Sequence, residues 1–380
     1  LLVPSDNAMK TYRDPISWAI WANDGIDNRE IWTFRVEMGK VAADVFKANE
    51  DGTKGTFLRT LGDGSRDVVT DRLQDIMDMH IVVADNAAEP LSGYIDEGRQ
   101  DYFLTKGGAV LAVSGAGENI RVKGCGDIEL DNQAAQVITM EDDQKGRYEM
   151  TNGRAFLIDR IMEDSYRSVY KTMGDTEAFK PFFNLLMGDE HVFSFFEEDK
   201  DVEPIFDMDV TKTSSGIGPI VTSFNNYRYT ILVPTGQALT DAFAADPDLH
   251  TWEEINLEPD YDKKKKMTIY LLNFLRYHFV DGILPVSDGV SYSGSYATAA
   301  RDQADHFVYI KVNGNGSELR FASESNAQET AKVLTTTAGD YNVFARDFIV
   351  NNEDYRKANQ IMASSRAVLH LVDRAINYRK

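Results

Sequence analysis

The chain repeats itself, and this repeat constrains the fold more than any other feature of the sequence. Three segments of the first half align without gaps with three segments of the second half, in the same order, at offsets of 230, 198 and 214 residues. The matched segments are 1–9 with 231–239, 79–82 with 277–280, and 152–161 with 366–375. The repeat therefore predicts two copies of one domain that differ in loop length.

The first matched pair predicts a strand that passes into a helix. A short apolar run ends at Pro4 in the first copy and at Pro234 in the second. Ser5 and Thr235 follow, and both are residue types that cap helices. The helices are predicted to start near residues 8 and 238.

The other two pairs predict a helix that ends at a histidine and a buried closing strand. His80 and His278 each follow a stretch with helical spacing of apolar residues. The closing runs are apolar and end in an Asp-Arg pair, at Asp159 and Asp373. Such a run is typical of a buried strand that reaches the surface at its end.

The spacing of the matched segments predicts an insertion in the first copy. The first copy needs 78 residues from Leu2 to His80, whereas the second needs 46 from Leu232 to His278, so about 32 extra residues are predicted. We place them within 16–66, before turn signals at Asp51-Gly52 and Asp63-Gly64. The first copy also lacks the helices predicted over 165–187, because the chain begins at its first strand.

Three of the four tryptophans, Trp18, Trp21 and Trp32, lie in this insertion. One interpretation is that their rings pack the insertion onto its own domain. The alternative is an exposed aromatic platform that binds a sugar or a protein partner. Because insertions in surface loops are tolerated and acquire binding roles, we predict that partner recognition lies in the segment that the copies do not share.

Composition excludes several classes of protein. The formal net charge of −21 would repel nucleic acid and the anionic face of a bilayer. A single cysteine, Cys125, rules out an intrachain disulfide, and no apolar run reaches the roughly 18 residues of a membrane span. The chain opens on an apolar strand rather than on Met, which predicts an upstream signal or lipidated leader.

The sequence predicts no catalytic or metal site. The six histidines show no His-x-x-x-His spacing, no Gly-x-Ser-x-Gly motif is present, and Cys125 has no basic neighbour that would make it reactive. The acidic runs 197–201 and 207–209 are predicted to be solvated loops rather than calcium sites, and Lys263 to Lys266 an exposed face. The glycine pairs at 115–117 and 314–316 predict hairpin turns.

The motifs together resemble a tandem pair of fasciclin domains. That family shows a strand running into Pro-Thr, a Tyr-His after a helix, and a closing strand with a central His and a final Asp. The second copy matches through Pro234-Thr235, Tyr277-His278 and the run 368–374 with His370 and Asp373. The first copy departs from the pattern, with Met79 in place of the Tyr and Phe156 in place of the closing-strand His.

The resemblance covers essentially the whole chain as two domains, residues 1–163 and 164–380. It implies an α+β fold, in which each domain is a strand-rich wedge with several helices. It implies a non-enzymatic adhesion or binding protein of the cell surface, without a cofactor, whose partner is a surface protein or a glycan. In bacteria such domains occur on lipid-anchored surface proteins, so we expect attachment to the outer membrane. The alternative is an accessory surface lipoprotein of an outer-membrane assembly that captures and transports glycans or nutrients.

For Tyr277 and His278 the resemblance leaves two roles open. Some animal members of the family use this region in receptor binding, whereas in the family fold it lies in or beside the core. We predict the structural role, with His278 and His370 buried and hydrogen-bonded, because an unpaired buried imidazole costs on the order of 1 to 3 kcal/mol. The remaining matched residues are predicted to be structural motif positions: Pro4, Ser5, His80, Asp159, Pro234, Thr235, His370 and Asp373.

Overall fold

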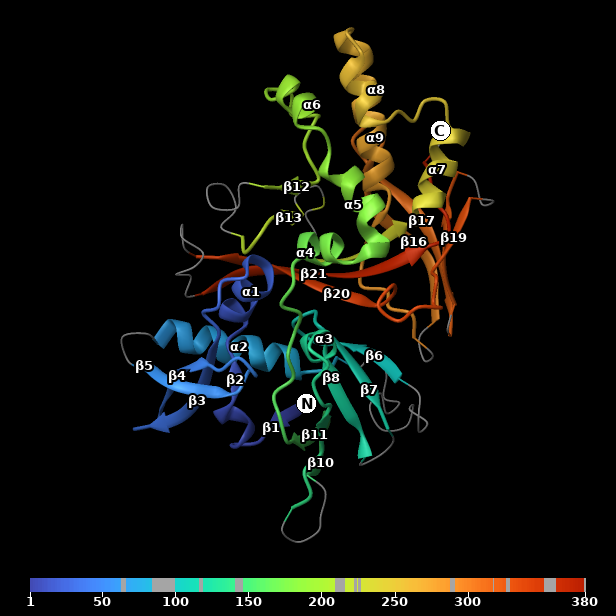
Figure 1. Cartoon of the computed structure of the whole chain (residues 1–380). Helices are drawn as coiled ribbons and strands as arrows, with labels where there is room; N and C mark the ends of the chain where they lie inside the picture. Colours follow the sequence, from blue (N-terminus) through green and yellow to red (C-terminus); the bar gives the residue numbers. More distant parts are fainter. Residues whose placement is uncertain are drawn as a thin grey trace. The chain divides into compact units, whose positions relative to one another are not determined.

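The computed structural model divides the chain into two compact units (Figure 1). Unit 1 comprises Leu1–Ser168, Thr211–Gly218 and Phe348–Ser364, and unit 2 comprises Val169–Val210, Pro219–Asp347 and Ser365–Lys380. The structure describes all residues except 63–65, 84–99, 116–118, 141–145, 209–215, 222–223, 225–226, 288–290, 317, 326–328, 352–359 and 379–380.

Unit 1 is built from three small sheets and helices that pack on them. Their strand orders are β1-β11-β10, β6-β7-β8-β9 and β2-β3-β4-β5. The strands are β1 (Leu2–Pro4), β2 (Tyr12–Arg13), β3 (Glu30–Glu37), β4 (Lys40–Ala48), β5 (Lys54–Leu61), β6 (Gln100–Leu104), β7 (Val110–Ser114), β8 (Arg121–Gly124), β9 (Ala135–Gln136), β10 (Arg147–Met150) and β11 (Gly153–Ile158). The helices are η1 (Ala8–Lys10), α1 (Pro15–Asp24), α2 (Arg66–His80) and α3 (Cys125–Glu129).

Unit 2 is dominated by an eight-stranded sheet of order β19-β18-β17-β16-β15-β14-β21-β20. Its strands are β14 (Arg228–Pro234), β15 (Phe279–Asp281), β16 (Ser291–Arg301), β17 (Phe307–Asn315), β18 (Glu318–Ser323), β19 (Thr330–Lys332), β20 (Val343–Val350) and β21 (Ile361–Val372), with a separate pair β12 (Phe206–Asp207) and β13 (Ile220–Val221). The end of β20, from Phe348, and the start of β21, to Ser364, belong to unit 1. The helices are α4 (Val169–Asp175), η4 (Glu177–Phe179), α5 (Lys180–Met187), α6 (Glu190–Phe195), α7 (Gly236–Ala245), α8 (Trp252–Leu257) and α9 (Tyr261–Arg276).

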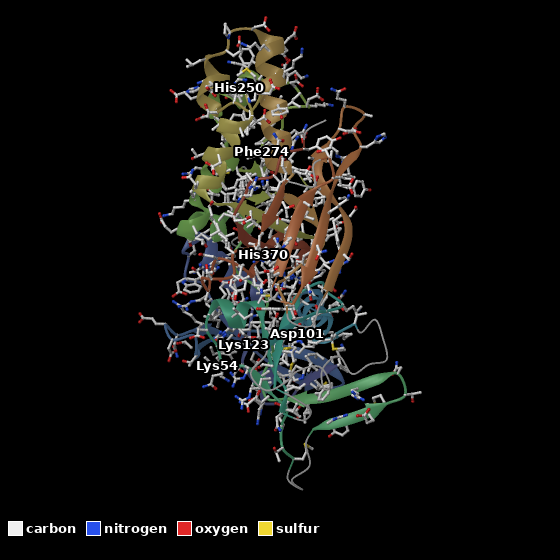
Figure 2. The ribbon with its side chains drawn as sticks, turned by 90° about the vertical axis from the view of Figure 1, so that its right-hand side faces the viewer. Lys54, Asp101, Lys123, His250, Phe274 and His370 are labelled. Carbon is white, nitrogen blue, oxygen red and sulfur yellow. The ribbon has the colours of Figure 1, made fainter. Side chains whose placement is uncertain are left out.

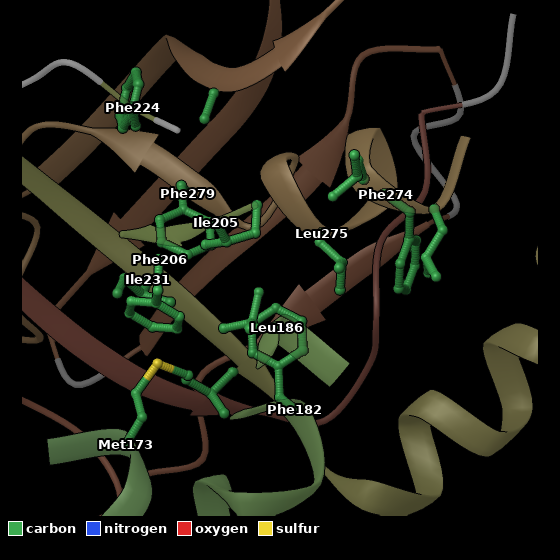
Figure 3. Close-up of a cluster of buried hydrophobic side chains, with 14 of the residues drawn as sticks. Met173, Phe182, Leu186, Ile205, Phe206, Phe224, Ile231, Phe274, Leu275 and Phe279 are labelled. Carbon is green, nitrogen blue, oxygen red and sulfur yellow. The ribbon is translucent and has the colours of Figure 1, made fainter. Parts of the chain in front are cut away.

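The largest core of unit 2 lies between its helices and strands β14 and β21. Phe182 and Leu186 from α5 meet Phe274 and Leu275 from α9 and Ile231 from β14 in this cluster, and all five side chains are buried (Figure 3). The three-and-four spacing of these apolar residues on α5 places them on one helix face. The helices predicted over 165–187 are confirmed as α4, η4 and α5.

Matching hydrogen bonds confirm the predicted duplication. β1 pairs in parallel with β11 as β14 does with β21. The Ser5 N–H donates to Ile158 O over 2.9 Å, and the Thr235 N–H donates to Val372 O over 3.1 Å. Ser5 Oγ and Thr235 Oγ1 then accept from the backbone of the following turn, at Ala8 and Ala238, over 3.3 and 3.2 Å.

The copies match at the end of the closing strand as well. Asp159 Oδ1 accepts from the Gln136 N–H over 2.9 Å, and Asp373 Oδ1 accepts from the Lys332 N–H over 2.7 Å. In both cases the aspartate therefore fixes the strand that runs beside the exit of the closing strand. The fold is α+β in both copies.

The segment that follows the first matched strand differs between the two copies, because the first copy contains extra strands there. After Ser5 only the three-residue turn η1 forms, because the chain then enters β2, which pairs with β3. Strands β3, β4 and β5 span residues 30–61, inside the insertion predicted at 16–66. In the second copy, where every residue of 235–260 is described, only α7 and α8 separate β14 from α9.

The strands on either side of the two predicted hairpin turns pair antiparallel, β7 with β8 and β17 with β18. Within these turns, residues 116–118 and 317 lie outside the described part of the chain. Among the described residues, no helix combines the length and the apolar character that crossing a bilayer requires.

Candidate functional site

The histidines at the ends of α2 and α9 hold the same position in the two copies. His80 Nδ1 lies 2.7 Å from Ile76 O, and the Met162 N–H donates to His80 Nε2 over 3.2 Å. His278 Nδ1 lies 2.9 Å from Phe274 O, and Nε2 accepts from the Ile376 N–H over 3.2 Å. Each neutral imidazole therefore donates to its own helix and accepts from the chain that leaves the closing strand.

The predicted structural role of His278 agrees with this geometry, and Tyr277 is equally enclosed. Both side chains are buried, and the Tyr277 hydroxyl donates to Tyr309 O over 3.0 Å. His370 Nε2 donates to Leu284 O over 3.0 Å, while Nδ1 accepts from the Asn342 N–H over 3.2 Å. None of these three side chains offers a surface to a partner in the folded unit.

Burial lowers the pKa of His278 and of His370 to about 4, so both rings are neutral at pH 7. Burial raises the pKa of Asp347 to about 6, even though its oxygens accept from the Val169 and Val221 N–H groups over 2.9 and 3.4 Å. All three groups belong to unit 2.

These shifts predict an acid-sensitive unit 2. A histidine whose pKa is lower in the folded state contributes stability that is present above its ordinary pKa of 6.5 and lost as the pH falls towards 4. Each of the two histidines lowers the free energy of unfolding by roughly 3 kcal/mol at most over this pH range. Asp347, whose pKa is raised, acts in the opposite direction and offsets about one histidine. We expect the free energy of unfolding of unit 2 to fall by about 3 kcal/mol between pH 6.5 and pH 4.

Denaturant titrations at several pH values would measure this dependence. The variant His370→Phe, which copies Phe156 of the first copy, should remove most of the loss between pH 6.5 and pH 4, because Asp347 then offsets the one remaining histidine. An unchanged pH dependence in that variant would contradict the assignment to the buried rings.

The tryptophans of the insertion act mainly as anchors. Trp18 and Trp32 are each only 2% exposed, and Trp21 is half-buried beside Trp18. Trp18 Nε1 donates to Glu30 O over 3.2 Å, and Trp32 Nε1 donates to Glu30 Oε2 over 3.0 Å. This burial favours the first interpretation of the rings, in which they fasten the insertion to its own domain.

Unit 1 also contains a buried ionic cluster that the sequence analysis did not find. Arg13 Nη1 lies 2.8 Å from Glu163 Oε2, which also accepts from Asn132 Nδ2 over 3.0 Å. Asp127 Oδ2 accepts from the Gly124 and Glu163 N–H groups over 2.9 and 3.0 Å. Burial, followed by the nearby Asp127 carboxylate, raises the pKa of Glu163 to about 7. The Asp127 carboxylate thus binds backbone, whereas the Glu163 carboxylate pairs with the side chains of Arg13 and Asn132.

The surface charge clusters pair with one another. Lys265 Nζ lies 2.7 Å from a carboxylate oxygen of Asp199 and 2.7 Å from one of Asp201, so a lysine occupies this acidic run. The prediction that Lys263 to Lys266 form an exposed face is wrong for Lys264. That side chain is buried, donates to Asn256 O over 3.0 Å and lies over the Phe195 ring.

Two other predicted features are placed by the structure. Cys125 is buried, and its Sγ donates to Val110 O over 3.2 Å. No group of three or more His, Cys, Asp or Glu side chains suited to a metal ion occurs in the described part of the chain.

An open groove of about 580 Å³ lies in unit 2 between α5, α7 and α8. Leu185, Leu239, Phe243 and Trp252 form its apolar lining. Trp252 Nε1 donates to Leu185 O over 2.8 Å, so the indole lines the groove with its polar atom already paired.

Large apolar side chains are exposed on the inserted strands of unit 1. Val36, Met38 and Val41 lie at the β3–β4 turn, and Phe57 and Leu58 lie on β5. β5 is an edge strand of its sheet, since it pairs only with β4 among the described residues. These residues were not predicted from the sequence, where the tryptophans were the candidates for binding. The signal for them is the short Met38-Gly39 turn between two strand-like runs.

Comparison with known proteins identifies a structural likeness only. No family model matches the sequence, and no curated protein matches it. Among solved structures, a FAS1 domain pair from the insect cell adhesion molecule fasciclin I matches over 81% of this chain and 80% of that chain, with 15% identity and a TM-score of 0.27. At this level of superposition the match says nothing about the ligand of this chain.

Proposed function

We propose that the chain is a non-enzymatic adhesion or binding protein of the cell surface, in which two copies of one domain form the scaffold and the inserted strands of the first copy contact the partner. The proposal includes a position outside the cell, on an outer membrane. The buried titratable groups support the non-enzymatic assignment, because those described above bond to backbone and to each other within the core.

The observation that carries the proposal is the exposure of apolar side chains on the insertion. Met38 is 97% exposed, Val36 75% and Phe57 53%. Val36 pairs across the hairpin with Val41, which is also exposed. Val36, Met38 and Val41 thus lie together at the turn, whereas Phe57, which pairs with Phe46, is a separate exposed ring farther along the sheet. Apolar side chains that are grouped on a surface without covering indicate an interaction site.

The conformation of Met38 supports a role for its side chain. Met38 has φ +50° and Gly39 has φ +76° in the two-residue turn between β3 and β4. Such turns favour Asn-Gly, because both residues adopt positive φ values that asparagine and glycine tolerate best. Methionine is therefore a poor choice for the stability of this turn, and its side chain points into solvent.

Substitution of Met38 should separate stability from binding. We expect Met38→Asn to raise the free energy of unfolding by about 0.5 to 1 kcal/mol, because the turn loses strain. We also expect beads coated with Met38→Asn, or with the stronger variant Val36→Asp/Met38→Asp/Phe57→Asp, to adhere less to cells of the producing organism. The triple variant should lose at least half of the wild-type adhesion.

The matched control is Met208→Asp/Tyr227→Asp/Leu257→Asp, which places the same three charges at exposed residues of unit 2. This control should adhere like the wild type. Equal adhesion of the triple variant and the wild type, measured with melting temperatures that show both to be folded, would contradict the role of the insertion.

The alternative function, an accessory lipoprotein of an outer-membrane assembly for glycan or nutrient capture, uses the same insertion as the contact with a transporter. It also requires a surface with the chemistry of sugar binding. The exposed side of strands β16 to β19 favours this alternative.

A further inference from the structure

Strands β16 to β19 of unit 2 present one side to the core and the other to solvent. Along β17 the residues alternate strictly between exposed and buried, from Phe307 to Asn315. The buried residues Val308, Ile310 and Val312 pack in a core cluster with Leu319 and Phe321 of β18. Figure 2 shows these strands in orange, with side chains standing out from the sheet.

The exposed side, which we name the open face, is defined by seven side chains: Phe307, Tyr309, Lys311 and Asn313 from β17, Glu318 and Arg320 from β18 and Lys332 from β19. Asn313, Arg320 and Lys332 are direct cross-strand neighbours and form one row. Lys311 and Tyr309 begin the next two rows along β17, at about 6.8 Å per row.

The aromatic residues of the open face are held in place and accessible. Phe307 is 41% exposed and Tyr309 46%. The Arg301 guanidinium carbon lies 3.6 Å from the centre of the Phe307 ring and fixes it by a cation–π contact. Exposed rings beside amide and guanidinium groups match the chemistry of a sugar, whose C–H face packs on a ring while its hydroxyls form hydrogen bonds.

The charge of the open face is opposite to that of the chain. Arg320 and Lys332 share one carboxylate, that of Glu318, at 3.0 and 2.6 Å. Lys311 forms no ion pair with the described residues, although Glu324 lies nearby through its bond to Ser295 of β16. Arg301 is 3.8 Å from Asp305. The face thus keeps a local excess of cations in a chain with a net charge of −21.

We infer that the open face binds a linear polysaccharide that carries carboxylates. This inference rests on the proposed function and deepens it by assigning a ligand class to unit 2. Lys311, Arg320 and Lys332 would pair with the carboxylates, Asn313 with hydroxyls, and Tyr309 with a sugar ring. A protein partner is less suited, because the face has few apolar side chains beyond its two rings, whereas interface centres are rich in them.

Affinity electrophoresis of the full chain in gels that contain polygalacturonate tests the inference. We expect retardation at low salt that weakens as the salt concentration rises, because screening reduces ion pairing. Lys311→Ser/Arg320→Ser should lower the affinity at least tenfold, and Tyr309→Ser should lower it several-fold. The control Lys171→Ser/Lys180→Ser removes two exposed lysines from helices α4 and α5 of the same unit and should bind like the wild type.

Other outcomes would overturn the inference. These are the absence of retardation, equal retardation in methyl-esterified galacturonan, and equal loss in the control variant. Bead adhesion that depends on Val36, Met38 and Phe57 while polygalacturonate fails to bind would retain the proposed function and reject this ligand. Melting temperatures equal to that of the wild type show that the variants are folded.

Discussion

Replacing Arg72 with methionine is expected to lower the free energy of unfolding of unit 1 by about 3 to 5 kcal/mol. Arg72 is only 1% exposed, and its Nε lies 2.6 Å from Asp14 Oδ1. It also pairs with Asp71. Removing the guanidinium leaves two largely buried carboxylates without their cation, and this is the costly way to break a buried ion pair.

The loss should spread because both carboxylates also bind backbone. Asp14 caps α1 by accepting from the Ser17 N–H over 2.9 Å. Asp71 accepts from the Ile361 N–H over 3.1 Å. Arg72 therefore joins the start of α1, the helix α2 and the start of β21 within unit 1.

Tryptophan fluorescence during denaturant unfolding would measure the effect, because three of the four tryptophans lie in unit 1. The matched control is Arg59→Met, which breaks an exposed ion pair with Glu30 at 2.7 Å. Exposed pairs contribute about 0 to 1 kcal/mol, so this control should shift the midpoint little. Equal shifts for the two variants would refute the central role of Arg72.

His278→Ala is expected to cost unit 2 about 2 to 4 kcal/mol. The ring is buried, with the Phe182 and Phe274 rings 5.2 and 5.0 Å away. Its removal opens a cavity and leaves the Ile376 N–H without an acceptor. His80→Ala should have a similar effect on unit 1, because the Met162 N–H loses its acceptor there.

Thermal unfolding followed by circular dichroism would measure both variants at pH 7. The control is His306→Ala, whose side chain is 79% exposed and should leave the melting temperature unchanged. A His278→Ala protein with wild-type stability but without binding would show that the imidazole serves a partner rather than the core.

The parts of the fold that could be predicted from the sequence are those that depend on neighbouring residues or on the internal repeat. Pro4-Ser5 and Pro234-Thr235 each combine the end of an apolar run with a capping residue, so the strand and the following turn could be inferred from a few neighbours. The repeat added the long-range information, because two histidines at matched positions imply matched surroundings. The same repeat located the extra strands β3 to β5 through the difference in spacing.

The role of individual charged residues was not predictable in this way. Arg72, Glu163 and Asp347 stand in ordinary sequence surroundings, and a charged residue at such a position is usually exposed. Arg72 and Asp347 are buried and Glu163 is half-buried, and the groups that stabilise them come from distant segments: Asp14 for Arg72, Arg13 for Glu163, and the Val169 N–H for Asp347.

The candidate binding surfaces also combine features that could be predicted from the sequence with features that could not. The amino-acid order is enough to infer that the insertion is the unshared segment and that a hairpin turn lies at 314–316, because spacing and turn residues are properties of a single stretch of chain. The folded structure is needed to see that Trp18 and Trp32 are buried while Met38 and Phe57 are exposed, and that Lys311, Arg320 and Lys332 share one face. Burial and cross-strand proximity depend on which distant elements cover or pair with a segment, and the sequence of that segment does not contain this information.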